Sequence, residues 1–255
     1  MSSRLAGKAI FVAGGGGIGN ELARRYASEG AAVAIGDISQ ELAQQVAGEI
    51  TAAGGTATGL HLNGADEASV RQAIQATVNE FGSLDGLHVN FACFKDGASG
   101  ADILDLPLEV YDEVMEVNAR GYVLCTREAL PHMLRSGGGS IVYTSGGAAY
   151  KGEPVRLAYA MSKSAVHALA RHVASRFGPE GVRANAISCG VIAHSRFYEV
   201  LKPEVIDALK SQSALKTRLG APGDIAAMGA LLMSEEGAYI TGQVISVDGG
   251  ITMRP

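Results

Sequence analysis

The sequence has no tryptophan and only three cysteines among its 255 residues. Cys93, Cys125 and Cys189 stand far apart and form no CxxC pair, so neither a zinc site nor a disulfide framework is indicated. We therefore expect three free thiols, buried or half-buried, and no bound metal.

Charge of one sign is not concentrated anywhere in the chain. Lys and Arg number 21 and Asp and Glu 26, which gives a formal net charge of −5 without a basic run. A nucleic-acid partner would need such a run to neutralise its phosphates, so none is expected. The opening stretch MSSRLAGKAIFVAGGGG holds no apolar segment long enough to span a bilayer and no cleavage site after one. We expect a cytoplasmic protein with no membrane partner.

Glycine, by contrast, is abundant, and many of the 34 glycines end short apolar runs, where turns are expected. Runs such as AIFVAG, AAVAIGD, GSIVYTS and QVISVDG are almost continuously apolar, as in strands covered on both faces. Helical patterning lies between such runs, over 20–29, 39–53, 67–81, 108–134 and 159–177. The alternation predicts an α/β protein with a parallel, doubly wound sheet of about seven strands and helices on both faces.

The region 190–220 departs from this alternation. It contains HSRFYEVLKPEV and is longer than most connections in compact domains. We expect a substrate loop or lid there, with one or two short helices. No linker or repeat divides the chain, so residues 1–255 are predicted to form a single domain.

The segment VAGGGGIGN follows the first predicted strand and opens the first predicted helix. Gly14, Gly16 and Gly19 fit the pattern GxGxxG, and Ile18 would anchor the new helix. Glycine permits the tight turn and lets a pyrophosphate approach the positive end of the helix. The segment therefore predicts a dinucleotide site.

Asp37 ends the second predicted strand, 18 positions after Gly19, where an acid is expected to accept hydrogen bonds from a ribose. Its carboxylate would repel a 2′-phosphate, and its neighbours Gly36 and Ile38 carry no positive charge. NAD is therefore expected rather than NADP. An aspartate in DISQE is equally suited to a turn or to a helix N-cap, and the sequence leaves that alternative open.

In YAMSK, Tyr159 and Lys163 stand four positions apart and so share one face of a predicted helix. Such a pair can be a surface contact without chemistry. It can also activate the phenol, because a cation within about 4–6 Å lowers a pKa by roughly 1–3 units. A tyrosine so activated could take the proton of an alcohol.

Taken in order, these segments resemble the short-chain dehydrogenase/reductase family. The likeness rests on GKAIFVAGGGGIG, LDGLHVNFA, VMEVNARGYVLCTREALPHM, GSIVYTSGG, YAMSK and GVRANAISCGVIAHS, and it covers nearly the whole chain. It implies a Rossmann-type fold, a nicotinamide cofactor, hydride transfer to or from a carbonyl or alcohol, and a homotetramer.

The resemblance also implies roles by position. Tyr159 matches the catalytic acid/base, Lys163 its partner, and Asn118 an asparagine that supports a proton relay. Asn90 matches an asparagine of the NNAG motif, and Asn63 takes the place of an aspartate beside the adenine. The implied cofactor site comprises Gly14, Gly16, Ile18, Gly19, Asp37, Asn63, Asn90, Tyr159, Lys163 and Ile192.

Several positions depart from the family pattern, and two of them bear on the catalytic site. SCGVIAH replaces the usual SPGxxxT, so His194 stands where a threonine normally contacts the nicotinamide carboxamide. We expect it to face cofactor or substrate, and the sequence leaves open the alternative of a solvated loop histidine. The family serine, 13 residues before the tyrosine, is replaced by Gly146. Strand alternation turns Ser145 to the opposite face from Gly146, but glycine frees the backbone at the strand end. We expect Ser145 to swing into the site; the alternative is that no serine acts.

The sequence therefore predicts an NAD-dependent short-chain alcohol dehydrogenase or ketone reductase acting on a secondary alcohol or ketone. Four side chains are expected to contact this small-molecule substrate: Phe94, Tyr150, His194 and Phe197. Their rings favour a cyclic or largely apolar substrate, whereas Arg156 and Arg196 favour an acidic one, and the sequence does not choose. The alternative function, supported by the altered serine position, is a non-catalytic NAD-binding homologue that senses the cofactor or scaffolds a complex.

Overall fold

The computed structural model describes residues 3–96 and 100–254, apart from the side chains of Ser195 and Arg196. One parallel sheet runs through this part of the chain, in the order β3-β2-β1-β4-β5-β6-β7. Its strands are β1 (Ala9–Ala13), β2 (Ala32–Asp37), β3 (Thr56–His61), β4 (Gly86–Val89), β5 (Gly139–Gly146), β6 (Val182–Cys189) and β7 (Val244–Val247). The order reverses between β1 and β4, and parallel sheets bind ligands beyond the carboxyl ends of strands at such a switch point.

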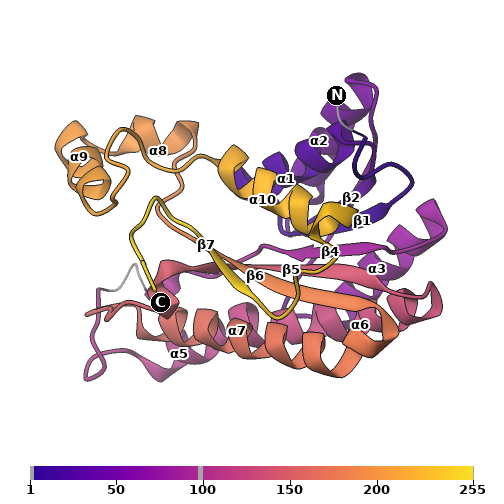
Figure 1. Cartoon of the computed structure of the whole chain (residues 1–255). Helices are drawn as coiled ribbons and strands as arrows, with labels where there is room; N and C mark the ends of the chain where they lie inside the picture. The colour runs from indigo at the N-terminus through magenta and orange to yellow at the C-terminus, as the bar shows by residue number, and fades with distance from the viewer. Residues whose placement is uncertain (1–2, 97–99, 255) are drawn as a thin grey trace.

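Helices cover both faces of the sheet (Figure 1). One face carries α1 (Gly16–Ser28), α2 (Gln40–Ala52) and α10 (Pro222–Met233). The other carries α3 (Glu67–Phe81), α5 (Leu108–Met115), α6 (Gly121–Arg135) and α7 (Leu157–Phe177). Short 3-10 turns occupy Gly147–Ala149, Gly178–Glu180 and Glu235–Gly237. The predicted fold class, a doubly wound parallel sheet between two helical layers, is confirmed.

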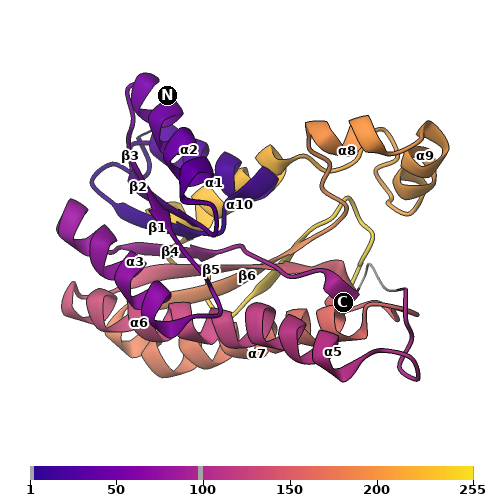
Figure 2. The ribbon, with the colours of Figure 1, turned by 180° about the vertical axis from the view of Figure 1, so that it is seen from behind.

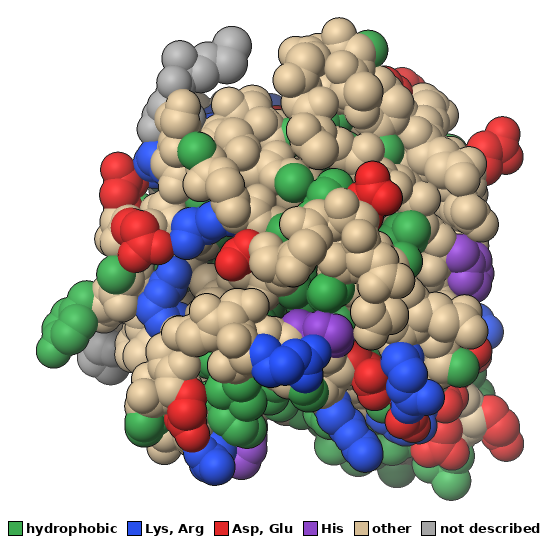
Figure 3. Space-filling view, turned by 90° about the vertical axis from the view of Figure 1, so that its right-hand side faces the viewer, with side chains coloured by type: hydrophobic (Ala, Val, Ile, Leu, Met, Phe, Trp, Pro, Cys, Tyr) green, Lys and Arg blue, Asp and Glu red, His purple; other side chains and the backbone are tan. Residues whose placement is uncertain are grey.

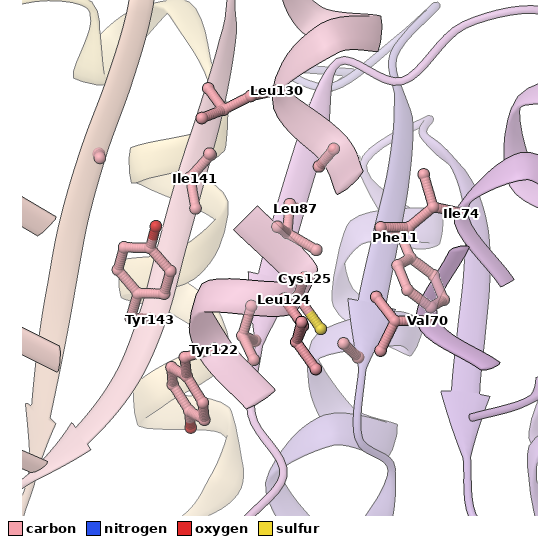
Figure 4. Close-up of a cluster of buried hydrophobic side chains, with 14 of the residues drawn as sticks. Phe11, Val70, Ile74, Leu87, Tyr122, Leu124, Cys125, Leu130, Ile141 and Tyr143 are labelled. Carbon is pink, nitrogen blue, oxygen red and sulfur yellow. The ribbon is translucent and has the colours of Figure 1, made fainter. Parts of the chain in front are cut away.

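The central strands are apolar along their whole length because both of their faces are buried. Every residue of β1 and β4 is buried. Figure 4 shows one side of this core, where Phe11 and Leu87 on the sheet pack toward Ile74 of α3 and Cys125 of α6. Each large apolar side chain buried in this way contributes roughly 1.5–3 kcal/mol to stability.

The helix predicted over 108–134 is in fact interrupted. A π-helical turn, Glu116–Arg120, separates α5 from α6 and contains the fully buried Asn118. The wider turn inserts one residue into the helical repeat, and such turns often occur at functional sites. Gly121, which follows it, lets the helix lie close to the loop after β3. A Cβ at this position would lie 2.6 Å from the carbonyl oxygen of Gly64.

The region 190–220 leaves the sheet after β6 and returns at Gly220, which pairs with Ile192 in an isolated bridge. It contains two short helices, α8 (Ser195–Val200) and α9 (Pro203–Ser211), as the sequence predicted. Figures 1 and 2 show both helices standing out from the two layers, at the end of the molecule where β6 finishes.

The opposite end of the molecule is a surface of mixed charge. Figure 3 shows Lys and Arg side chains lying among Asp and Glu side chains there, without a patch of one sign. Ion pairs such as Lys8–Glu235, at 2.8 Å, join the two signs. Among the described helices, none is long and apolar enough to cross a lipid bilayer.

Candidate active site

Tyr159 lies in the first turn of α7 and faces a cavity of about 530 Å³ at the carboxyl ends of β5 and β6. Gly146, Cys189 and Phe197 line the same cavity. A Cβ at position 146 would lie 3.1 Å from the Tyr159 hydroxyl, so a side chain at this position would point toward the phenol. The backbone N–H of Tyr159 donates to the Asp96 carboxylate at 2.8 Å, which fixes the start of the helix.

Lys163 lies one helical turn after Tyr159, with 1% of its surface exposed. Its Nζ donates to the hydroxyl of Tyr122 at 3.0 Å and to the backbone carbonyl of Thr144 at 2.9 Å. The same nitrogen is 5.6 Å from the centroid of the Tyr159 ring. Burial lowers the pKa of Lys163 to about 8. The predicted proximity of the ammonium and the phenol is confirmed.

The electrostatic effect on Tyr159 differs from the sequence-based expectation. Burial raises the pKa of Tyr159 above its usual value, and Cys189 adds to this effect. Among the charges that act on it, Arg156 lowers the pKa, and its guanidinium carbon lies 5.8 Å from the ring centroid. Arg156 precedes α7 with φ at 64°, a left-handed conformation that is uncommon outside glycine. Burial, and not activation by Lys163, therefore dominates the shift in the pKa of Tyr159.

Asn118 is placed by the π-helical turn against the segment that follows β4. Its Oδ1 accepts from the backbone N–H of Cys93 at 2.6 Å, and its Nδ2 donates to the carbonyl of Cys93 at 2.8 Å. The Asn118 side chain therefore holds the backbone at Cys93 in place beside the site. Its role in a proton relay stays a prediction.

The glycine loop has the form that a dinucleotide needs. Gly14 and Gly16 have φ of 103° and 74°, values that glycine adopts readily. A Cβ at Gly19 would lie 1.9 Å from the carbonyl oxygen of Gly14, so only glycine fits there. Gly15, at the N-cap of α1, supplies no side-chain cap, which leaves the positive end of the helix open to an anion. Ile18 packs against the core, as predicted.

Asp37 and Asn90 hold this loop from two sides. The Asp37 carboxylate accepts from the N–H of Gly15 at 3.0 Å and from that of Ser39 at 2.9 Å. It does not cap α2, since Ser39 is the N-cap, but its bond to the N–H of Ser39 forms a turn, as the alternative interpretation expected. Asn90 donates from Nδ2 to the carbonyls of Gly14 at 3.1 Å and Gly15 at 3.2 Å.

Three more of the predicted cofactor and substrate residues lie in the segments that follow β3 and β6. Asn63 follows β3 and accepts from the N–H of Ala65 at 3.1 Å, which makes a turn. His194 lies over the glycine loop, since a Cβ at Gly17 would be 2.9 Å from its ring. His194 is thus beside the glycine loop with an exposed side chain, and its contact with cofactor or substrate stays a prediction. Ile192 lines a neighbouring cavity of about 590 Å³ beneath 190–220.

On the substrate side, the structure brings two of the predicted aromatic residues to Tyr159. The Phe94 ring lies 4.9 Å from the Tyr159 ring, and Phe197 lines the cavity. Tyr150 does not, and its prediction is wrong. The turn Gly147–Ala149 carries Tyr150 to another cavity, where its ring stacks on His167 at 4.9 Å under the guanidinium of Arg254.

The prediction that Ser145 swings into the site is also wrong for this structure. Its Oγ is 2.8 Å from Nε2 of His167 and 3.3 Å from the carbonyl of Lys163, on the α7 side of β5. The alternation of the strand persists to its last residue, because both of these partners hold Ser145 in place. Gly146 is the position that faces Tyr159, and it has no hydroxyl.

Sequence reasoning missed the residues that support the site from behind. Tyr122 contacts Lys163, and Asp96 anchors the first turn of α7. A signal for Tyr122 was present, since it stands four residues after Asn118 on the same helical segment. Asp96 has no such local signal, because its partner lies 63 residues away.

Comparison with known proteins shows likeness along nearly the whole chain. The model of the family described as Enoyl-(Acyl carrier protein) reductase matches residues 12–252. A 2,5-dichloro-2,5-cyclohexadiene-1,4-diol dehydrogenase from Sphingobium indicum is 35% identical over 251 residues, which are 98% of this chain and 98% of that protein. A 7alpha-hydroxysteroid dehydrogenase from Bacteroides fragilis is 32% identical over 253 residues, 99% of this chain and 97% of that protein.

The fold likeness is equally extensive. The solved structure of a short-chain dehydrogenase/reductase from Serratia marcescens has a TM-score of 0.90 with this chain at 34% sequence identity. The match covers 98% of this chain and all of that one.

Proposed function

Because the chain belongs to the short-chain dehydrogenase/reductase family, a family of oxidoreductases, we propose that it transfers hydride between NAD(H) and a secondary alcohol or ketone. The observation that carries this proposal is the meeting of a phenol, a buried ammonium and an open glycine loop at one end of the sheet. Such a set suits proton transfer beside a bound dinucleotide.

The nicotinamide, when bound, supplies the hydride acceptor for oxidation or the hydride donor for reduction. Tyr159 takes the alcohol proton in one direction and gives it to the carbonyl oxygen in the other. Burial raises the pKa of Tyr159, so at neutral pH the free site holds a phenol ready to donate. Alcohol oxidation is the harder direction, because Tyr159 must be ionised to take the proton. The positive charges of Lys163 and Arg156 favour that ionisation.

Lys163 has a second task in this proposal. An ammonium has three N–H donors, and the oxygens of Tyr122 and Thr144 accept from it. A remaining donor is suited to a ribose hydroxyl of the cofactor. The two hydrogen bonds to Tyr122 and Thr144 hold the nitrogen near the Tyr159 ring.

The preference for NAD over NADP rests on Asp37. Its carboxylate faces a small cavity of about 130 Å³ beside the glycine loop, and Arg24 lines the same cavity. The sequence did not indicate this cation. Arg24 is ion-paired with Glu49 at 2.7 Å, so its charge is offset rather than offered to a 2′-phosphate.

For the substrate we propose a cyclic, largely apolar secondary alcohol or ketone. Phe94 stacks near Tyr159, and Phe197 lines the cavity. Arg156, which would favour an acidic substrate, is already paired with Glu153 at 2.7 Å. The relatives from Sphingobium indicum and Bacteroides fragilis are named for a cyclohexadiene diol and a hydroxysteroid, which agrees with this class.

We also propose a homotetramer that uses the outer faces of α6 and α7. Val123 and Met161 are exposed there, with 47% and 43% of their surfaces accessible, beside the small exposed residues Ala165 and Ala168. Small side chains permit close packing of helices. A light-scattering mass near that of one chain, 26.2 kDa, would contradict this proposal.

The proposed activity is tested by following nicotinamide absorbance with NAD and a panel of cyclic alcohols at alkaline pH. A second candidate, a non-catalytic NAD-binding protein, is favoured by one observation, the missing hydroxyl at Gly146 beside Tyr159. Tight NAD binding without turnover on any alcohol or ketone of the panel would support that candidate and contradict the enzyme.

A further inference from the structure

A chain of buried polar side chains connects α1 to the glycine loop through the middle of the sheet. The Tyr26 hydroxyl lies 2.6 Å from Nδ1 of His88, and Nε2 of His88 lies 3.0 Å from Oγ1 of Thr144. Thr144 in turn donates to Oδ1 of Asn90 at 3.0 Å. Tyr26 and His88 are fully buried, and Thr144 is 6% exposed. Tyr26 lies on α1, Thr144 on β5 and His88 on β4, and Asn90 directly follows β4.

The donor and the acceptor of each hydrogen bond in this series follow from Asn90, the member that contacts the glycine loop. Nδ2 of Asn90 must donate, because its partners are the carbonyls of Gly14 and Gly15. Oδ1 of Asn90 is therefore an acceptor, and it uses the single hydroxyl proton of Thr144. His88 must then donate from Nε2, which leaves Nδ1 to accept from the hydroxyl of Tyr26.

We propose that His88 is a positioning residue that aligns the cofactor loop by holding the neutral Nε2–H tautomer. Acting through Thr144, it fixes the orientation of the Asn90 amide, which in turn holds the carbonyls of Gly14 and Gly15. The Nδ1–H tautomer would place two acceptors face to face in a buried site, Nε2 of His88 and Oγ1 of Thr144, because the Thr144 proton is already given to Asn90. Such a mismatch is costly where water cannot compensate for it.

Other features of the site agree with this role. Burial lowers the pKa of His88 to about 3, which keeps the ring neutral. Burial also raises the pKa of Tyr26, which keeps its hydroxyl a donor. Gly229 of α10 leaves room for that hydroxyl, since a Cβ there would lie 2.3 Å from it.

Thr144 joins the chain to the acid/base pair through different atoms. Its hydroxyl serves His88 and Asn90, whereas its carbonyl accepts from Lys163 and Tyr122. The substitution Thr144→Val removes the hydroxyl and keeps the carbonyl. The two functions can therefore be separated in one variant.

The tautomer is tested directly by nitrogen-15 NMR of the histidine-labelled protein, with His88→Gln used to assign the signal. The expected spectrum shows a protonated Nε2 and an unprotonated Nδ1 for His88 at neutral pH. A protonated Nδ1 would overturn the inference. This measurement needs neither cofactor nor activity.

The consequence for the loop is tested by amide hydrogen exchange over residues 14–19 and by calorimetric affinity for NAD. Thr144→Val is expected to speed the exchange and weaken NAD binding by about tenfold, as for one lost aligning hydrogen bond. Thr77→Val is the matched control, because it removes an equally buried hydroxyl that bonds only within α3. It is expected to change neither loop exchange nor affinity.

Unchanged loop exchange in Thr144→Val, or equal effects of the two valine variants, would overturn the inference. Only the NAD-affinity arm rests on the proposed function. Failure of the parent protein to bind NAD would contradict that function, while the exchange and the tautomer would still decide the role of His88.

Discussion

The cofactor side and the substrate side of the site are built differently. On the cofactor side, the glycine loop is held by Asp37, by Asn90 and by contacts that admit only glycine. On the substrate side, α9 has no buried residue, and Tyr198, Val200 and Val205 are 44–67% exposed. Rigid parts preorganise binding, whereas segments with few buried contacts open easily. The difference indicates a fixed cofactor site combined with an adaptable substrate site.

The largest effect is expected from a substitution at Tyr159, which should separate turnover from NAD binding. Tyr159→Phe removes the proton-transfer group but leaves every contact of the glycine loop in place. We expect turnover to fall by about a thousandfold or more while the affinity for NAD changes little. Steady-state kinetics and calorimetry measure the two quantities. A variant that keeps even a tenth of the parent's turnover would rule out the role of Tyr159.

Gly146→Ser would add a hydroxyl on the substrate side of the site. The new side chain would start 3.1 Å from the Tyr159 hydroxyl and offer a hydrogen bond to the substrate oxygen. One such bond in the transition state is worth about a hundredfold in rate, so kcat is expected to rise by up to that factor. Ser145→Ala is the matched control, and because Ser145 faces His167 it should leave kcat unchanged. A hundredfold loss in the control would restore the serine to the mechanism.

Asp37→Ala tests the cofactor side. The parent is expected to prefer NAD over NADP by at least about tenfold, because the carboxylate repels a 2′-phosphate. Without it, the preference should shrink, and the ion pair of Arg24 with Glu49 should keep it from reversing. The ratio of kcat/KM for the two cofactors measures this. Equal affinity of the parent for both would contradict the assignment.

A smaller effect concerns Lys163, which lies between the two sides. Its pKa is about 8 in the folded protein against 10.5 for the free side chain, so between these values the unfolded state binds more protons. The free energy of unfolding should therefore rise with pH across this window in the parent, relative to Lys163→Met. Urea unfolding of both proteins from about pH 7 to about pH 10 tests this, because the titrations of groups that do not interact with Lys163 cancel in the difference. If the difference in unfolding free energy between the two proteins does not vary with pH, the lowered pKa of Lys163 is contradicted.

Much of the cofactor side could be predicted from the sequence because its signals are local. The spacing of Gly14, Gly16 and Gly19 and the position of Asp37 at a strand end are set by one βαβ unit. Tyr159 and Lys163 were likewise found from a helical spacing.

What failed depended on contacts between distant segments. Ser145 stays on the α7 side because His167 holds it, and Tyr150 follows it there because of the turn between them. The π-helical turn brings Asn118 to the backbone of Cys93, and the hydrogen bonds of His88 connect α1 with β5. Neither has a signature in any short stretch of sequence.

The central claim is that this protein moves a hydride between an alcohol carbon and NAD. The most direct measurement uses cyclic secondary alcohols deuterated at the carbinol carbon, followed by mass spectrometry of the nicotinamide product. The account predicts that at least one alcohol yields reduced NAD carrying deuterium, and that Tyr159→Phe yields none. Bound NAD that acquires no deuterium from any alcohol of the panel would contradict it.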